Sequence, residues 1–190
     1  MQEHFSPQQS LQLIQSMIAK TKSNIGANRF YFLLWGWLIF GAILLQFFLK
    51  VVVGYPYHYA VWLITFVAVA VTIMRNRQEG RRSGVRTYIG DSIGYLWMGI
   101  GITFFVLTFI ISFSIGWLHA WPFMIVMYGT GTFISGKILQ FSPMVIGGII
   151  NWIIAAACVF VPYDYQLLLA AAAIAASYII PAYKIKKESN

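Results

Sequence analysis

The chain has 190 residues, of which 59% are hydrophobic and only 9% are charged, and its formal net charge is +8. This composition lies far outside the usage of soluble globular domains, so we expect a polytopic membrane protein with no separate soluble domain. The single cysteine, Cys158, excludes an intramolecular disulfide and every multi-cysteine metal motif. We expect it to serve as a small core hydrophobe.

The first 28 residues are polar or amphipathic, and we expect no cleavable signal peptide in them. Ser6 and Pro7 favour the start of a helix, after which apolar residues recur at helical spacing. The pattern predicts an amphipathic helix over 7–25 that lies in the inner membrane interface, with its lysines near anionic headgroups. The alternative is a helix packed against the protein's own cytoplasmic loops.

Six apolar stretches follow, and a helix needs about 20 residues to cross a bilayer. They lie near residues 30–52, 57–74, 90–116, 121–139, 143–161 and 164–183. On the side opposite the termini, short turns that contain proline, tyrosine or tryptophan join them, as expected at headgroup depth. The sequence therefore predicts an all-α fold with six transmembrane helices in three antiparallel hairpins, forming one domain over 29–183, and a basic cytoplasmic tail over 184–190.

The positive charge falls on one side of this topology. Twelve of the thirteen Lys and Arg residues belong to the side that holds both termini, and only Lys50 lies opposite. Positively charged loops are retained in the cytoplasm, so we expect both termini to be cytoplasmic. Because the topology explains the excess of Lys and Arg over Asp and Glu, we expect these side chains to contact anionic lipid headgroups, and we expect no nucleic-acid binding.

The first apolar stretch begins with a distinctive run, Phe32-Leu33-Leu34-Trp35-Gly36-Trp37. This start resembles that of a group of small, uncharacterised bacterial inner-membrane proteins with six helices. The resemblance covers about a fifth of the chain and implies a bacterial plasma membrane. It implies no substrate, activity or site residue.

Small residues mark faces where helices can approach closely. The set comprises Gly90, Gly94, Gly99, Gly101, Gly129, Gly131, Gly136, Ala170 to Ala173, Ala175 and Ala176. Two readings stay open: packing within one chain, or a seam between copies of the chain. Asn151 is a further polar residue inside a predicted span, and it either bonds to a neighbouring helix or meets a ligand.

No catalytic constellation is visible, so we expect no enzyme activity and no cofactor. Gly90-Asp91-Ser92-Ile93-Gly94 matches the Gly-x-Ser-x-Gly pattern by letter, but that motif works on a strand-to-helix turn beside a histidine base. Here it begins a predicted membrane helix. We expect Asp91 to lie near the helix start, where its charge is favourable.

The turns opposite the basic side supply one ionisable residue each: His58, His119 and Asp164. Two histidines and a carboxylate suit a divalent transition metal, so convergence of the turns would make a metal site. The alternative is three independent interfacial side chains.

The longest predicted loop carries five arginines, Arg75, Arg77, Arg81, Arg82 and Arg86. These side chains fix topology, and they also suit anionic lipid headgroups or an acidic protein surface. We therefore expect a non-enzymatic membrane module that binds or regulates a partner, which is a second copy or another membrane or cytosolic protein. The alternative is the membrane-embedded substrate-binding component of a vitamin-type uptake system, which the chain resembles in size, six crossings and inward termini.

Overall fold

The computed structural model describes residues 29–83 and 88–185, and within them it contains helices and no strand. The first helix covers Arg29–Val52 and ends in the π-helical turn η1 (Phe48–Val52). The next elements are η2 (His58–Leu63), α2 (Ile64–Ser83), α3 (Tyr88–Ile110), η3 (Ile111–Ile115), η4 (Trp117–His119), α4 (Ala120–Ile138) and α5 (Ser142–Cys158). A last continuous helix is formed by α6 (Tyr163–Ile174), the π-helical η5 (Ala175–Ile179) and α7 (Ile180–Lys184). The predicted all-α fold is confirmed.

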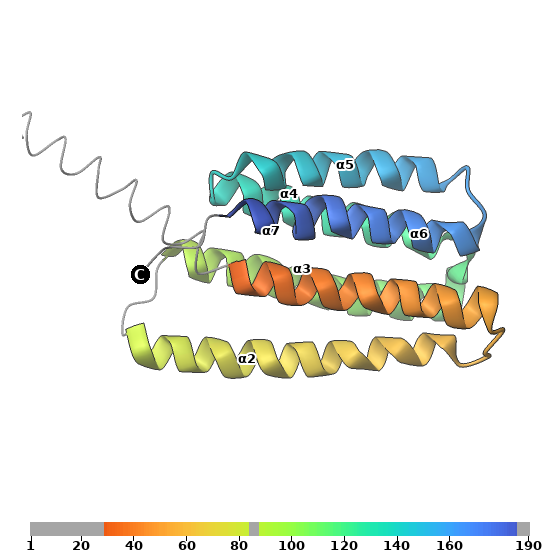
Figure 1. Ribbon diagram of the computed structural model, residues 1–190, viewed down its shortest axis with the longest axis horizontal. Coiled ribbons are helices and arrows are strands. Elements are labelled where there is room, and N and C mark those ends of the chain that lie inside the picture. The colour runs from red at the N-terminus through yellow and green to blue at the C-terminus, as the bar shows by residue number, and fades with distance from the viewer. Residues whose placement is uncertain (1–28, 84–87, 186–190) are drawn as a thin grey trace, which may run out of the picture.

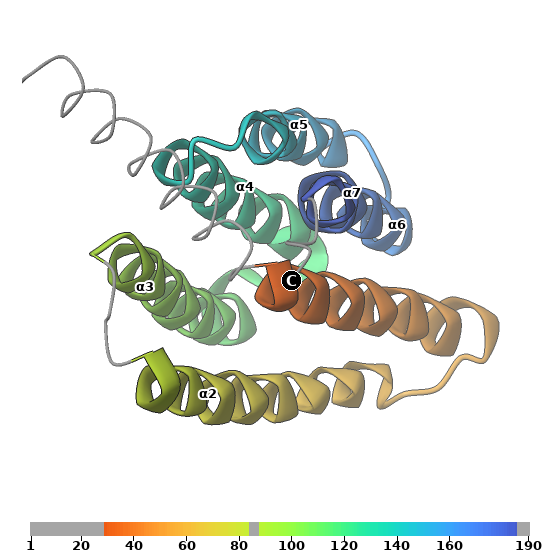
Figure 2. The same cartoon turned by 60° about the vertical axis from the view of Figure 1, so that its left-hand side comes forward.

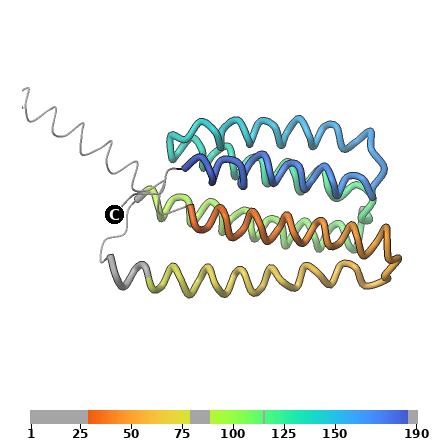
Figure 3. Tube along the Cα trace, viewed as in Figure 1, coloured from red at the N-terminus to blue at the C-terminus, as the bar shows by residue number. Residues whose placement is uncertain are grey.

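Consecutive helices run in opposite directions along one bundle, as the colour gradient in Figures 1 and 3 shows. Pro143 and Pro162 stand where α5 and α6 begin, positions at which the fixed φ of proline favours a helix start. Gly54 and Gly116 adopt φ of 70° and 81° in the turns, a conformation that glycine adopts without strain. The up-and-down order therefore follows from local turn chemistry.

Four helices are long and apolar enough to cross a membrane: Arg29–Val52, His58–Gln78, Ile89–Ser114 and Tyr163–Lys184. The fifth helix, α5, is apolar but has 17 residues, and α4 does not meet the same criterion. Glycine, threonine and serine make up much of α4, and several of these residues are buried between helices. Six expected crossings thus correspond to four clear membrane-spanning candidates and two helices whose composition serves packing.

Helices α4 and α5 approach each other through glycines. A methyl group at Gly148 would lie 2.8 Å from the backbone nitrogen of Phe133 and 2.9 Å from the carbonyl oxygen of Gly129. At Gly136 it would lie 2.7 Å from the backbone nitrogen of Val145. These distances are shorter than van der Waals contact, so the small residues of α4 serve packing within the chain.

The glycines of α3 behave differently. No atom of the described residues lies within 4 Å of a methyl group built on Gly94, Gly99 or Gly101, and all three are exposed. Packing within the chain is therefore confirmed for the glycines of α4 and α5, whereas a seam between copies of the chain stays a prediction for the exposed glycines of α3.

Helix α2 lies at the edge of the bundle, as the turned view in Figure 2 shows. Only 6% of the most apolar stretch of His58–Gln78 is buried, against 61% of that of Tyr163–Lys184. The indole N–H of Trp35 donates to the hydroxyl of Thr72 at 3.1 Å, which ties α2 to the first helix. The bundle thus has a tightly packed half, α4 to α7, and a loosely packed edge.

Candidate functional site

One end of the bundle is basic. Figure 1 places there the start of the first helix and the ends of α2, α4 and α7. The basic residues of these helix ends include Arg29, Arg75, Arg77, Arg81, Arg82, Lys137 and Lys184. Arg29 Nε donates to the carbonyl oxygen of Ala182 at 3.2 Å, which joins the first and last helices. We call this the basic end.

The arginine-rich segment that was predicted as a loop mostly belongs to the last part of α2, and it is described only in part. Arg75 lies with its guanidinium carbon 3.8 Å from the ring centroid of Phe30, an arrangement that favours a cation–π contact. Arg77 is exposed, and Arg81 and Arg82 belong to the last turn of α2. Arg86 lies outside the described residues, as does the predicted N-terminal amphipathic helix. Contact of these arginines with lipid or a protein stays a prediction.

The opposite end carries the three ionisable turn residues, and we call it the aromatic end. His58 begins η2, His119 ends η4, and Asp164 lies in the first turn of α6. No three His, Cys, Asp or Glu residues among those that the structure describes form a group that could hold a metal ion. Asp164 forms an ion pair with Lys50, and His58 faces Gln46. The expected two-histidine, one-carboxylate metal site is therefore not assembled, because two of its members have other partners.

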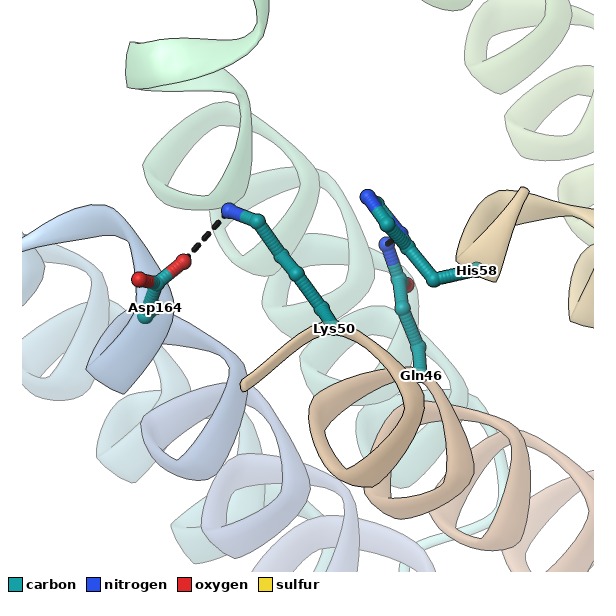
Figure 4. A network of polar contacts seen from close by, with 4 residues as sticks. All are labelled: Gln46, Lys50, His58 and Asp164. Atoms are coloured by element: carbon teal, nitrogen blue, oxygen red, sulfur yellow. Dashed lines mark hydrogen bonds and ion pairs between the residues drawn. The ribbon is translucent and has the colours of Figure 1, made fainter. Parts of the chain in front are cut away.

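The residues that do meet at the aromatic end form a polar cluster of Gln46, Lys50, His58, Trp62 and Asp164, four of which Figure 4 draws. Gln46 and Lys50 are four residues apart, so they share one face of the first helix. Gln46 reaches toward η2, and Lys50 reaches across to α6, where its Nζ also lies 4.0 Å from the ring centroid of Tyr163. The cluster connects three segments that are distant in the sequence.

The indole N–H of Trp62 fixes which groups in this cluster donate hydrogen bonds and which accept them. An indole N–H only donates, so the Gln46 atom that lies 2.7 Å from Trp62 Nε1 is the amide oxygen. The amide nitrogen of Gln46 then faces His58 Nδ1 at 3.3 Å, and Nδ1 must accept. His58 is consequently a neutral imidazole with its proton on Nε2. This residue acts as an acceptor that orders η2, and its other nitrogen remains available.

Replacement of Gln46 by leucine tests this cluster. Gln46 is buried, and its loss leaves the indole N–H of Trp62 and Nδ1 of His58 without their partner. We expect the free energy of unfolding to fall by about 1–3 kcal/mol, the cost of stranding such groups. Thermal unfolding in detergent, followed by tryptophan fluorescence, measures the change. Gln78→Leu, at an exposed position of α2, should change stability by less than about 0.5 kcal/mol, and equal losses in the two variants would contradict the assignment.

A second buried group lies toward the basic end and combines aromatic and polar side chains. The ring centroid of Trp97 is 5.6 Å from those of both Tyr128 and Tyr178, which are 4.9 Å from each other. Trp97 Nε1 donates to the hydroxyl of Ser135 at 3.0 Å. Tyr178 belongs to η5, and such π-helical turns inside α-helices occur often at functional sites. The sequence carries no periodicity signal that would have located this turn.

Asn151 is fully buried on the face of α5 that meets α4, where its Cβ would be 2.8 Å from a methyl group at Gly129. Neither its amide nitrogen nor its amide oxygen has a hydrogen-bond partner among the described residues. The expectation that Asn151 bonds to a neighbouring helix is therefore not met. The alternative, a polar group of a ligand, remains open.

The Gly-x-Ser-x-Gly pattern lies inside α3, with Asp91 in the first turn as predicted. A serine within a regular helix lacks the strained turn that the hydrolase motif requires. Cys158 is buried, as expected for a core hydrophobe.

These observations define a helical, multi-pass membrane protein. Comparison of the chain with protein-family models, with curated proteins and with solved structures finds no match.

Proposed function

We propose that the chain is a non-enzymatic module of a bacterial plasma membrane that binds another membrane protein through α3. The contrast between the two halves of the bundle supports this role. Helices α4 to α7 pack on one another through glycines and alanines, whereas α3 exposes most of its length. An exposed apolar helix is ordinary in lipid, and the feature that favours a protein partner is the shape of its exposed face.

That shape is a notch flanked by large side chains. Gly94, Met98, Gly101 and Phe105 follow one another at helical spacing and therefore share one face of α3. Met98 and Phe105 are exposed, and within the described part of the chain no atom lies within 4 Å of a methyl group built on Gly94 or Gly101. Helix association in lipid depends on close van der Waals contact, for which a glycine notch allows a second helix to approach. This face is the observation on which the proposed function rests.

Photo-crosslinking tests the proposed partner. A photoreactive amino acid at Phe105 should give a crosslinked product in native membranes, and the Gly94→Leu and Gly101→Leu double variant should lower its yield about tenfold by filling the notch. Gly41→Leu is the matched control, because Gly41 is also exposed and open but lies on the first helix. A product of twice the chain mass identifies a second copy, and another mass identifies a different membrane protein. A yield at Phe105 no higher than at Phe66 of α2 would refute the proposal.

We propose further that the basic end lies in the cytoplasm, so that both termini are cytoplasmic and all six helices cross the membrane. The positive-inside rule supports this orientation, since the described ends of the first helix, α2, α4 and α7 all carry Lys or Arg. In intact cells, an impermeant thiol reagent should label Tyr165→Cys at the aromatic end and leave Gln78→Cys unlabelled. Cys158→Ser supplies a background free of other thiols. Labelling of Gln78→Cys in intact cells would reverse the orientation.

The arginine segment, Arg75, Arg77, Arg81, Arg82 and Arg86, then meets anionic headgroups of the inner leaflet or an acidic surface of a cytosolic protein. Each basic side chain near an anionic membrane surface contributes about 1 kcal/mol. In this proposal the segment orients the module and adds to partner binding. It does not by itself select the partner.

The second candidate function is substrate binding for a vitamin-type uptake system, and the unpartnered amide of Asn151 favours it. A buried amide without a hydrogen bond is costly, so a ligand that satisfies it would be held firmly. Mass spectrometry of small molecules released from the purified protein separates the candidates. A bound metabolite that is lost in Asn151→Leu supports uptake, and none in either protein supports the module.

A further inference from the structure

A cavity of about 350 Å³ opens where α4 turns into α5, at the basic end of the bundle. Its walls include Lys137, Gln140, Phe141, Ser142, Val145 and Ile146. This cavity belongs to neither of the two groups described above. Its lining divides into a polar part and an apolar part.

The polar part consists of Lys137, Gln140 and Ser142, whose side chains can each donate hydrogen bonds. Lys137 is exposed, and it forms no ion pair with a described residue. Lys137 Nζ also lies 5.7 Å from the ring centroid of Phe133, so the lysine stem leans along α4. A lysine without an acidic partner among the described residues, next to two neutral polar residues, suits a phosphate.

The backbone at Gln140 supports a role for its side chain. Gln140 has φ of 53° and is the only non-glycine residue with positive φ in the described part of the chain. The amide N–H of Phe141 donates to the carbonyl oxygen of Gly136 at 2.8 Å, and that of Gln140 donates to Lys137 at 3.2 Å, which together form a Schellman C-cap. Glycine is favoured at this position because it adopts positive φ without strain. Glutamine at this position costs conformational free energy, and its side chain belongs to the lining of the cavity.

The apolar part continues along α5. Val145 and Ile146 line the cavity, and Ile146, Ile149 and Ile153 are exposed at helical spacing toward the middle of the bundle. This stripe begins at the cavity and leads away from the polar part. A ligand that fits both parts has a phosphate at one end and a hydrocarbon chain at the other.

We propose that the cavity between α4 and α5 binds an anionic phospholipid, with its phosphate held by Lys137, Gln140 and Ser142 and an acyl chain lying along Ile146, Ile149 and Ile153. The net positive charge of the surrounding basic end favours an anionic headgroup over a zwitterionic one, whose quaternary ammonium would meet Lys137. The proposal requires only that the chain is a membrane protein. It does not depend on the proposed partner of α3.

Native mass spectrometry of the full chain in detergent tests the site. Phosphatidylglycerol and phosphatidylcholine are added separately, and the fraction of protein that retains one lipid is measured. We expect the wild-type chain to retain phosphatidylglycerol at least fivefold better than phosphatidylcholine. Lys137→Gln should weaken phosphatidylglycerol binding about five- to tenfold, corresponding to about 1–1.4 kcal/mol. Lys184→Gln is the matched control, because it removes an exposed lysine of the same end that does not line the cavity.

Three outcomes would overturn the proposal. Equal retention of the two lipids would show that the site does not select an anionic headgroup. Equal losses in Lys137→Gln and Lys184→Gln would assign the binding to the basic end as a whole. Displacement of phosphatidylglycerol by millimolar inorganic phosphate alone would assign the cavity to free phosphate, because a bound lipid is also held by its acyl chain. Thermal unfolding of each variant shows whether it is folded, and Ser142→Ala provides a second variant that should weaken binding by a smaller factor.

Discussion

Gly148→Ala is expected to lower the free energy of unfolding by about 2–3 kcal/mol, although it adds a single methyl group. That methyl group would lie 2.8 Å from the backbone nitrogen of Phe133 and 2.9 Å from the carbonyl oxygen of Gly129. Neither atom belongs to a flexible side chain, so α4 and α5 must separate to admit it. We expect this separation to weaken close contact along the α4–α5 interface, including the contact between Asn151 and Gly129.

The control variant is expected to raise the free energy of unfolding instead of lowering it. Gly94→Ala places a methyl group in open space on α3, where alanine favours the helix over glycine by up to about 1 kcal/mol. Thermal unfolding of both variants in one detergent gives the comparison. If the two substitutions shift the melting temperature in the same direction, the close approach of α4 and α5 is not as described.

Tyr178→Ala is expected to lower the free energy of unfolding by about 3–5 kcal/mol, as large-to-small core substitutions of aromatic residues do. Tyr178 is buried in η5, where its ring packs against Phe32, Trp97 and Tyr128 from three other helices. The substitution therefore leaves a void at the point where the first helix, α3, α4 and the last helix meet. Tyr178→Phe keeps the ring and should cost less than about 1.5 kcal/mol.

Tyr165→Ala is the matched control for Tyr178→Ala, because Tyr165 lies on the same helix and is exposed. It should change stability by about 0.5 kcal/mol or less. Chemical unfolding in mixed micelles provides the measurement. A cost for Tyr178→Ala that does not exceed that for Tyr165→Ala would show that η5 is not the centre of packing.

The two expected results reflect a difference in packing between two parts of the bundle. The half that contains α4 to α7 is held by close backbone contact and by the aromatic group around Tyr178. The edge that contains α2 is held by few contacts, among them the Trp35–Thr72 hydrogen bond and the Gln46, Trp62 and His58 contacts.

The helices and most of their ends could be predicted from the sequence, because they depend on local chemistry. Apolar length indicated six helices, and in the structure Pro143, Pro162, Gly54 and Gly116 lie at helix limits. The end of α2 was predicted wrongly, because the helix continues through the polar residues after 74 to Ser83. The segregation of positive charge to one end followed as soon as the helices alternated in direction. Asp91 in the first turn of α3 was likewise expected from its position beside the start of an apolar stretch.

Only the tertiary structure decided which side chains meet. Gly94 and Gly148 look alike in the sequence, yet one faces outward and the other contacts backbone, because that depends on which face of each helix turns toward its neighbours. Lys50 and Asp164 are 114 residues apart and form an ion pair at a helix junction that no periodicity specifies. The predicted metal site was not assembled for the same reason, since Gln46 and Lys50 reached His58 and Asp164 from the first helix. Local propensity sets each helix, and the choice of contacting faces emerges only when all of them pack together.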